Sequence, residues 1–421
     1  MKLVSTRTPG LHATFMAAVQ AGLAPDGGLF VPVELPRFPD VSELLKLDFP
    51  SRATEILHRL LGEEFPRSVV EMLARSAFTF PAPRVKVGDR LSALELFHGP
   101  TLAFKDFGAR FLARVLALGA GDRPRTVLTA TSGDTGAAVA QAFQGLPGVR
   151  VVVLYPAGRV SPLQERQFAT CGGNVLALAV AGSFDDCQRL VKGAFEDAEQ
   201  VSRLGLTSAN SINIARLLAQ TLYYFEAVAQ ADPGPLVVSV PSGNFGNLYA
   251  GLMAQAMGAP IHAFVAATNA NRVVPDYLDT GTYRPRPSVA TLSNAMDVGS
   301  PSNWERIFTR FGGDHGGMVA ALRWGSCTDA ETMATVVALD GAGYLADPHG
   351  AVACAVLRAH LRPGEQGLFL ATAHPAKFRE ALTPALGREI PLPRTLSDLL
   401  AKPLLSEPLA AETEALKRRL A

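Results

Sequence analysis

Short runs of apolar residues recur along the middle of the chain, and each is followed by a segment whose apolar positions repeat at helical spacing. We predict strands at residues 126–130, 150–154 and 175–180. The predicted helices lie at residues 135–144, 161–171, 184–203 and 213–230. Strands that are apolar throughout and alternate with helices are typical of parallel sheets covered on both faces.

The same alternation returns in the second half of the chain. Predicted strands lie at 236–240, 261–266 and 367–372, with a helix at 247–257. Two such runs predict an α/β fold with two open, twisted, largely parallel sheets, which are flanked by helices and separated by a cleft. Residues 281–326 are rich in Gly, Pro and Ser, so we expect a long irregular loop over the surface or the cleft.

A chain of 421 residues is long for one domain, so we expect more than one. Residues 1–94 are mixed and Pro-rich, with a predicted helix at 51–61, and form an N-terminal segment. A smaller α/β domain is expected at residues 95–230 and a larger one at 231–421. The N-terminal segment could pack with the larger domain.

Composition excludes several classes of protein. The net charge is +1, which argues against a nucleic acid or an acidic membrane as partner. The four cysteines form no C-x-x-C pair and no histidines cluster near them, so we expect no metal site and a reducing compartment. The chain shows neither a secretory signal nor an apolar run of membrane-spanning length, so we expect a cytoplasmic protein.

A single lysine, Lys105, lies inside the apolar and aromatic run FHGPTLAFKDF at residues 97–107. Desolvation lowers the pKa of an ammonium group, and a neutral amine can form a Schiff base with an aldehyde cofactor. The same run would also suit a lysine whose stem covers a core face while its head reaches Asp106 or water.

Two Gly-rich loops each leave a predicted strand and open a helix. The first is Thr131-Ser132-Gly133-Asp134-Thr135 and the second is Gly243-Asn244-Phe245-Gly246-Asn247. Free N–H groups at helix N-termini suit a carboxylate or phosphate, although each loop could equally be an ordinary capped turn. Neither has the spacing of a P-loop or of a dinucleotide fingerprint. With Lys105, the loops fit an aldehyde cofactor that carries a phosphate and a substrate that carries a carboxylate.

Two further segments offer polar groups. Asn213 and Arg216 are three residues apart and share a helix face that begins near Ser211, which suits a phosphate dianion or a plain solvated helix. Thr372 falls at the carboxyl end of a predicted strand. Nearby Lys377 is the one serious rival of Lys105, but its surroundings are less apolar.

These motifs resemble those of threonine synthases, which are pyridoxal-phosphate (PLP) enzymes of fold type II. The run at 97–107 is similar to the segment that carries the cofactor lysine, and the resemblance extends almost to the C-terminal tail. It implies that Lys105 is the catalytic residue and holds PLP as a Schiff base. It also implies that the PLP phosphate is held by Gly243, Asn244, Phe245, Gly246 and Asn247, and that the Thr372 hydroxyl meets the pyridine nitrogen.

The resemblance also assigns the substrate-binding residues. The substrate carboxylate would be held by Thr131, Ser132, Gly133, Asp134 and Thr135. The substrate phosphate would be held by Ser211, Asn213 and Arg216. Asp134 departs from many fold-type-II enzymes, which carry Asn beside the 3′-oxygen of the cofactor.

The implied reaction is a lyase step of threonine biosynthesis, which converts O-phospho-L-homoserine and water to L-threonine and phosphate. A related phospholyase that releases a keto acid would need the same lysine, loops and phosphate site. A PLP-binding regulator without turnover would not need both Lys105 and a phosphate site. By the same resemblance we expect a monomer whose partner is a small-molecule substrate.

Overall fold

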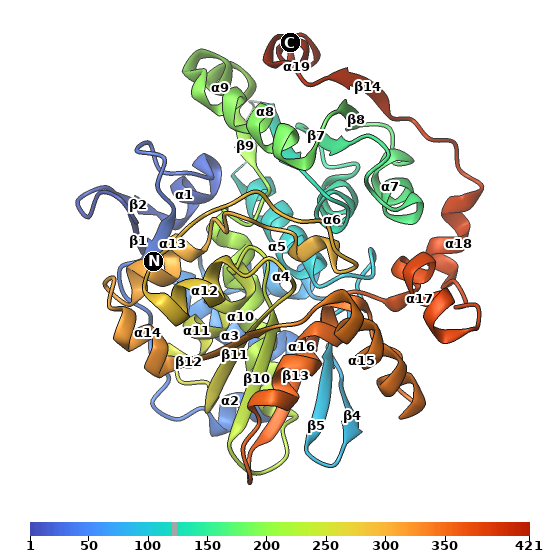
Figure 1. The fold of residues 1–421 in the computed structure, drawn as a ribbon. Coiled ribbons are helices and arrows are strands. Elements are labelled where there is room, and N and C mark those ends of the chain that lie inside the picture. Colours follow the sequence, from blue (N-terminus) through green and yellow to red (C-terminus); the bar gives the residue numbers. More distant parts are fainter. Residues whose placement is uncertain (120–123) are drawn as a thin grey trace.

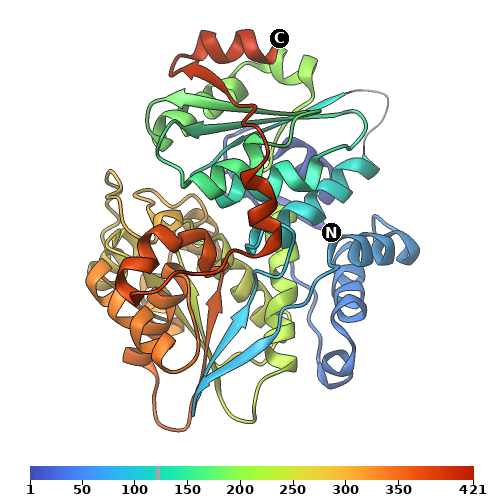
Figure 2. The ribbon, with the colours of Figure 1, turned by 90° about the vertical axis from the view of Figure 1, so that its right-hand side faces the viewer.

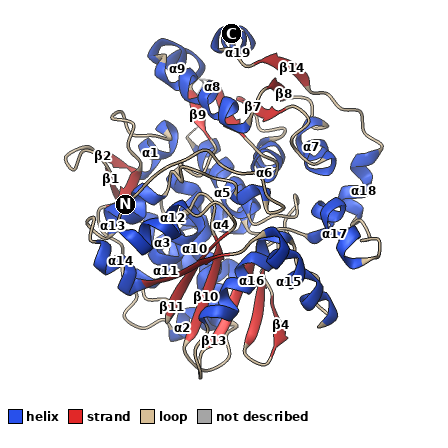
Figure 3. Ribbon diagram, viewed as in Figure 1, coloured by secondary structure: helices blue, strands red, loops and turns tan. Residues whose placement is uncertain are grey.

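Two α/β domains lie one above the other, each built around its own sheet (Figures 1 and 2). The structure is a computed structural model and describes residues 1–119 and 124–421. Figure 3 distinguishes the strands from the helices that surround them. Among the described helices, none combines the length and apolar character that crossing a membrane requires.

The smaller domain has a sheet of five parallel strands. Their order is β14 (Glu407–Ala410), β8 (Val175–Ala181), β7 (Val149–Pro156), β6 (Arg125–Ala130) and β9 (Leu206–Ser208). Helices α6 (Asp134–Phe143) and α8 (Phe184–Glu196) cover opposite faces. Val153 of β7 packs in the core beside α6, and Leu154 packs in the core beside α8. Both faces of the strand are therefore buried, which explains its continuous apolar run.

The larger domain has a six-stranded sheet, parallel except for the antiparallel pair β4–β5. The order is β12 (Leu322–Ser326), β11 (Ala263–Thr268), β10 (Leu236–Pro241), β13 (Gln366–Ala371), β5 (Leu91–Glu95) and β4 (Arg84–Gly88). Val237 faces helix α16 (Pro348–His360), and Val238 faces helices α10 (Ile214–Ala229) and α11 (Gly246–Ala256).

The N-terminal segment forms a small antiparallel sheet and four helices. The strands, in sheet order, are β2 (His12–Thr14), β1 (Lys2–Ser5) and β3 (Phe30–Pro32). The helices are α1 (Phe15–Ala21), α2 (Ser42–Lys46), α3 (Phe49–Leu61) and α4 (Arg67–Ala77). Helix α3 packs against α4 and α10, where Arg52 forms a buried ion pair with Glu226.

The remaining helices complete the two domains and the C-terminal segment. They are α5 (Lys105–Leu118), α7 (Pro162–Ala169), α9 (Ala198–Leu204), α12 (Val273–Thr280), η1 (Asn294–Met296), α13 (Trp304–Arg310), α14 (His315–Ala321), α15 (Asp329–Gly341), η2 (Pro375–Phe378), α17 (Arg379–Leu386), α18 (Arg394–Leu400) and α19 (Thr413–Leu420). The predicted helix at 184–203 is two helices, because Asp197 ends α8 and caps α9.

The sheets place two domain boundaries differently from the sequence prediction. Strands β4 and β5 fall in or at the edge of the expected N-terminal segment, yet they belong to the larger sheet, where β5 pairs with β13 and β4 pairs with β5. The C-terminal tail was expected in the larger domain, but β14 pairs with β8 of the smaller one. Figure 2 shows this tail running up to the smaller domain, where Leu416 and Leu420 are buried. Pairing between strands that are far apart in the sequence leaves no signal in the local sequence of either strand.

The prediction of an irregular loop over residues 281–326 is wrong for its second half. Residues 304–326 contain α13, α14 and β12, the edge strand of the larger sheet. Gly325 lies in β12, where a side chain would approach Val356 of α16 to within 2.8 Å. Gly325 weakens the strand pattern in the sequence, but a glycine is required there because α16 packs closely against β12.

Candidate active site

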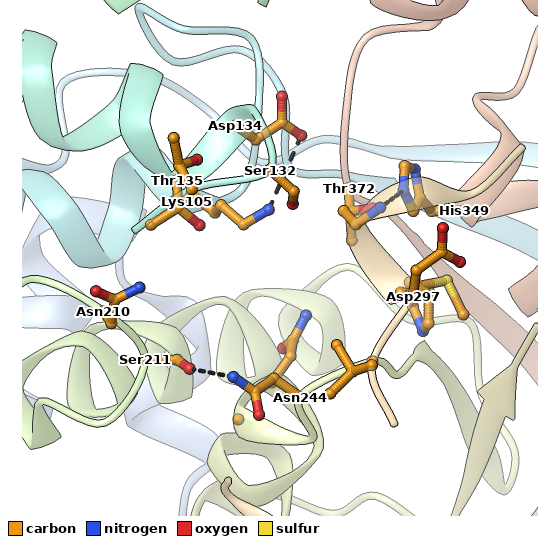
Figure 4. Close-up of a pocket in the computed structure, with 18 of the residues that line it drawn as sticks. Lys105, Ser132, Asp134, Thr135, Asn210, Ser211, Asn244, Asp297, His349 and Thr372 are labelled. Atoms are coloured by element: carbon orange, nitrogen blue, oxygen red, sulfur yellow. Dashed lines mark hydrogen bonds and ion pairs between the residues drawn. The ribbon is translucent and has the colours of Figure 1, made fainter. Parts of the chain in front are cut away.

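A cavity opens between the two domains at the carboxyl ends of β6, β10 and β13. Open parallel sheets bind ligands at these ends. Its wall contains most of the residues expected from the sequence, namely Lys105, Thr131, Ser132, Asp134, Thr135, Ser211, Arg216, Gly243, Asn244, Phe245, Gly246, Asn247 and Thr372. Gly133 and Asn213 lie outside this wall. Figure 4 shows Lys105 beside Ser132, Asp134 and Thr135, with Ser211 and Asn244 on another side.

Lys105 is the first residue of α5, and a short antiparallel contact holds it beside Thr372. Ala103 pairs with Ala373 in an isolated β-bridge, and the Phe104 N–H donates to the Thr372 carbonyl at 2.9 Å. Leu102 has a positive φ of 57°, which turns the chain into this contact. The lysine is therefore fixed to the end of β13 by main-chain geometry.

The Lys105 amine lies in a desolvated, mixed-charge environment. Burial lowers its pKa to about 8, Asp134 at 3.9 Å opposes this shift, and the Arg216 cation adds to it. Asp106, the alternative partner considered from the sequence, instead accepts hydrogen bonds from Thr101. A lysine with this pKa keeps a useful neutral fraction near neutral pH, which a nucleophile or base requires.

The loop at residues 131–135 is shaped by the Thr131 hydroxyl. This oxygen accepts from the N–H groups of Gly133 and Gly136 at 2.9 and 2.8 Å and donates to the Gly133 carbonyl. The hydrogen-bonding capacity of the Thr131 hydroxyl is therefore used within the loop, so that Thr131 stabilises the loop conformation. Among the described residues, none accepts from the main-chain N–H groups of Ser132 and Thr135. These N–H groups, at the start of α6, are available to an anion.

The loop at residues 243–247 leaves β10 and opens α11. No described residue accepts a main-chain hydrogen bond from the N–H groups of this loop. The Asn247 Oδ1 accepts from the hydroxyls of Tyr223 and Tyr224 at 2.5 and 2.8 Å. Its Nδ2 is buried and has no partner in the described part of the chain. A row of free donors at a helix N-terminus is a suitable site for a phosphate.

We predict that Gly243→Ala weakens cofactor binding by roughly 5- to 150-fold, the equivalent of about 1–3 kcal/mol of overpacking. A Cβ at residue 243 would lie 2.6 Å from the Met296 Cα, so main chain must move. Equilibrium titration of the apoprotein with PLP measures the effect. Gly341→Ala is the matched control, because a Cβ there meets nothing within 4 Å. Equal affinities in both variants would contradict the assignment of the loop.

Arg216 is a buried cation without a counter-ion in the described part of the chain. Its side chain is 2% exposed, one guanidinium nitrogen donates to the Ala209 carbonyl at 2.8 Å, and Nε has no partner. Burial lowers its pKa to about 10. Ser211 lies nearby in the wall, and its hydroxyl accepts from the amides of Asn244 and Asn303. Its own proton therefore remains available for a ligand.

Asn213 does not share the Arg216 face, as the sequence had suggested. Its Oδ1 caps α10 through the Ala215 N–H, and its Nδ2 donates to the carbonyls of Val19 and Ser208. The residue precedes the helix, so three-residue spacing does not place its side chain on the same face. The structure makes Asn213 a structural cap rather than a ligand.

The residues at 294–298 close another part of the wall. His349 also lines the cavity. Its Nε2 accepts from the Ala295 N–H at 3.2 Å, so its Nδ1 carries the proton that it donates to Asp347. His349 therefore fixes this wall as a neutral imidazole.

Sequence reasoning missed three polar residues of the wall, Gln188, Asn210 and Gln220. Asn210 donates to the Ala130 carbonyl at 2.9 Å, which ties its loop to the end of β6. Gln220 lies four residues after Arg216 on α10, and its Oε1 is buried without a partner in the described residues. The helical spacing from Arg216 could have identified Gln220; Asn210 gave no comparable signal.

His374 follows Thr372 but lies outside the wall, and it gives a prediction about stability. Burial lowers its pKa to about 4, and the neighbouring His98 and Lys377 add to the shift. Because the unfolded chain binds the proton more tightly, up to about 3 kcal/mol of stability is lost as pH falls from about 6.5 towards 4. We expect His374→Asn, which can cap the same turn, to lose less over that range. Denaturant unfolding at both pH values tests this, and equal losses would contradict it.

Comparison with known proteins identifies the class and then the family. Residues 79–372 match the family model described as pyridoxal-phosphate-dependent enzyme, which covers more than half of the chain. The chain is therefore a PLP-dependent enzyme of fold type II, as its two sheets and cavity indicate. Residues 2–78 and 350–419 match the models of the threonine synthase N terminus and C-terminal region.

Individual relatives agree with these models. Threonine synthase from Haemophilus influenzae is 52% identical over 97% of this chain and 96% of its own. The crystal structure of threonine synthase from Escherichia coli has a TM-score of 0.95 and 51% identity, covering 100% of this chain and 99% of its own. The PLP-bound threonine synthase from Brucella melitensis has a TM-score of 0.93 and 38% identity, covering 100% and 98%. The chain belongs to the threonine synthase family.

Proposed function

We propose that the protein converts O-phospho-L-homoserine and water to L-threonine and phosphate. The observation that carries this substrate is Arg216, a buried cation without a counter-ion in the described residues, in the same cavity as the desolvated Lys105. An active site that carries an amine nucleophile and an unpaired guanidinium suits an amino acid that bears a phosphate.

The residues of the cavity fit PLP. The cofactor, when bound, supplies an electron sink for negative charge at the substrate α-carbon. Lys105 would hold its aldehyde carbon, and the N–H groups of residues 243–247 with the orphaned Asn247 amide would hold its phosphate. The Thr372 hydroxyl has no hydrogen-bond partner among the described residues and would meet the ring nitrogen. A hydroxyl there, unlike a carboxylate, leaves that nitrogen neutral.

Three groups of this chain would orient the substrate. The N–H groups of Ser132 and Thr135, at the start of α6, suit its carboxylate. Arg216 and the free proton of the Ser211 hydroxyl suit its phosphate. Because Arg216 is buried, binding the phosphate there would also stabilise the negative charge that develops on the phosphate as it leaves. Asn213 does not belong to this set, because its Oδ1 caps α10 and its Nδ2 donates to the carbonyls of Val19 and Ser208.

Lys105 is the group that we assign to proton transfer at the substrate α-carbon. Its lowered pKa provides both the neutral and the protonated form near neutral pH, so that one amine can remove a proton and later return it. The buried carboxylate of Asp106 is an unsuitable rival, because both of its oxygens accept hydrogen bonds from Thr101.

The test is a simultaneous assay of phosphate and L-threonine from O-phospho-L-homoserine with the PLP-loaded protein. Equal molar amounts of both products support the proposal. Phosphate released with a keto acid and ammonia would identify a phospholyase instead. Absence of both pairs of products, with PLP bound, would show that the substrate is wrong.

We also propose that the enzyme works as a monomer in the cytoplasm. All the groups assigned above come from one chain, so the site is complete without a second copy. Each of the four cysteines is a free thiol, as a reducing compartment requires. Sedimentation at micromolar concentration would contradict the first part if it showed a dimer.

A further inference from the structure

The two carboxylate oxygens of Asp134 have different partners. Oδ1 accepts from the Lys377 Nζ at 2.6 Å and from the Gln164 Nε2 at 2.9 Å. Oδ2 faces the Lys105 Nζ at 3.9 Å, as Figure 4 shows. Oδ1 is therefore held by two hydrogen bonds, whereas Oδ2 faces Lys105, the lysine that we assign to the cofactor.

Lys377 is held rigidly on the side of Asp134 away from the cavity. Its side chain is 0% exposed, and its ammonium group also donates to the Thr101 carbonyl at 2.9 Å. It lies on η2, immediately after the end of β13, whereas Asp134 begins α6 and Gln164 lies on α7. The Asp134 carboxylate at the start of α6 is thus held by partners on two other elements, η2 and α7.

A fixed pair of this kind has an electrostatic role that a neutral residue could not supply. Burial raises the pKa of the Asp134 carboxyl, but Lys377 and then Lys105 outweigh this and hold it well below its ordinary value. Asp134 therefore stays ionised. The other charged or titratable groups around the Lys105 amine are Arg216 on α10, Asp347 and His349 at the start of α16, and Asp297 after η1.

We propose that Asp134 and Lys377 act as positioning residues for Lys105, and that their ion pair sets the proton affinity of the Lys105 amine. This inference rests on the proposed function, because it takes Lys105 as the reactive lysine. The negative charge of Asp134 favours the ammonium form of Lys105. The positive charge of Lys377 partly neutralises that of Asp134 and so limits this effect. An Asn at position 134 could accept the same hydrogen bonds but would supply no charge.

The two partners should therefore move the pKa of Lys105 in opposite directions. Asp134→Asn leaves Lys377 and Arg216 unopposed, so the Lys105 pKa should fall by about 1–3 units. Lys377→Met leaves the whole charge of Asp134 to Lys105, so the pKa should rise by about one unit. A merely loosened cavity would raise the pKa towards about 10.4 in both variants.

The experiment is competitive acetylation of the apoprotein with acetic anhydride between pH 6 and 11, quantified for each lysine by mass spectrometry. The chain has eight lysines, so each can be followed separately. Lys86→Met is the matched control, because it removes an exposed lysine remote from the cavity and should leave the Lys105 titration unchanged. Opposite shifts in the two variants support the proposal; shifts of the same sign, or none, overturn it.

Lys377→Met leaves a buried carboxylate without its main partner and could prevent folding. The double variant Asp134→Asn/Lys377→Met removes both charges, and its Lys105 pKa should lie between those of the two single variants. A double-variant value outside that range overturns the inference. Because these titrations use no substrate, their outcome is independent of the product assay. If the Lys105 pKa shifts in opposite directions in the two variants but no threonine is formed, the proposed reaction is contradicted and the inference about Asp134 and Lys377 is still supported.

Discussion

Lys105→Ala is expected to abolish threonine formation, with a fall in kcat of at least about 10⁴-fold. The variant loses the amine that would hold the cofactor and the base that would move the α-proton. No neighbouring amine can take over, because Lys377 is buried and ion-paired with Asp134. The measurement is the joint phosphate and threonine assay on PLP-treated protein.

Covalent trapping gives the same prediction a second readout. Borohydride reduction of the PLP-loaded protein should attach the cofactor to the peptide that contains Lys105. Lys86→Ala is the control, since that lysine is exposed on β4 and should leave both activity and trapping intact. A reduced adduct on Lys377 would overturn the assignment of the reactive lysine.

Arg216→Met is expected to lower kcat/KM for the phosphorylated substrate by about 10²–10³-fold. The guanidinium has no counter-ion among the described residues, so the substrate phosphate would be its partner. Removing an unpaired buried cation should leave the thermal stability of the apoprotein unchanged or raise it. Steady-state kinetics and thermal unfolding measure the two effects.

Arg306→Met is the matched control for this variant. Arg306 is as deeply buried as Arg216, but its guanidinium donates to the carbonyls of Phe30, Ser211 and Ile212. Its loss leaves these acceptors unpaired, so the control should be clearly less stable. Inorganic phosphate should raise the Tm of the wild-type apoprotein and have little effect on Arg216→Met. A destabilised Arg216→Met with unchanged kcat/KM would contradict the phosphate assignment.

Local chemistry made much of the site predictable from the sequence. An isolated lysine in an aromatic run and two glycine-rich turns after apolar strands each carry their signal within a few residues. The structure brings all three to one cavity. The Arg216 prediction also depended on local spacing. The same spacing failed for Asn213, because it takes no account of where the helix begins.

The α/β alternation, the parallel sheets, and the lysine and anion loops could be predicted from the sequence, since each depends on residues close together in the chain. Three features became visible in the folded chain alone: the return of the C-terminal tail to β8, the place of β12 at the sheet edge, and the pairing of Lys377 with Asp134. These features join residues that lie far apart in the chain. They form because sheet edges and charged side chains are buried against partners that are distant in the sequence. Such burial produces no repeating pattern of apolar residues within a short stretch of sequence.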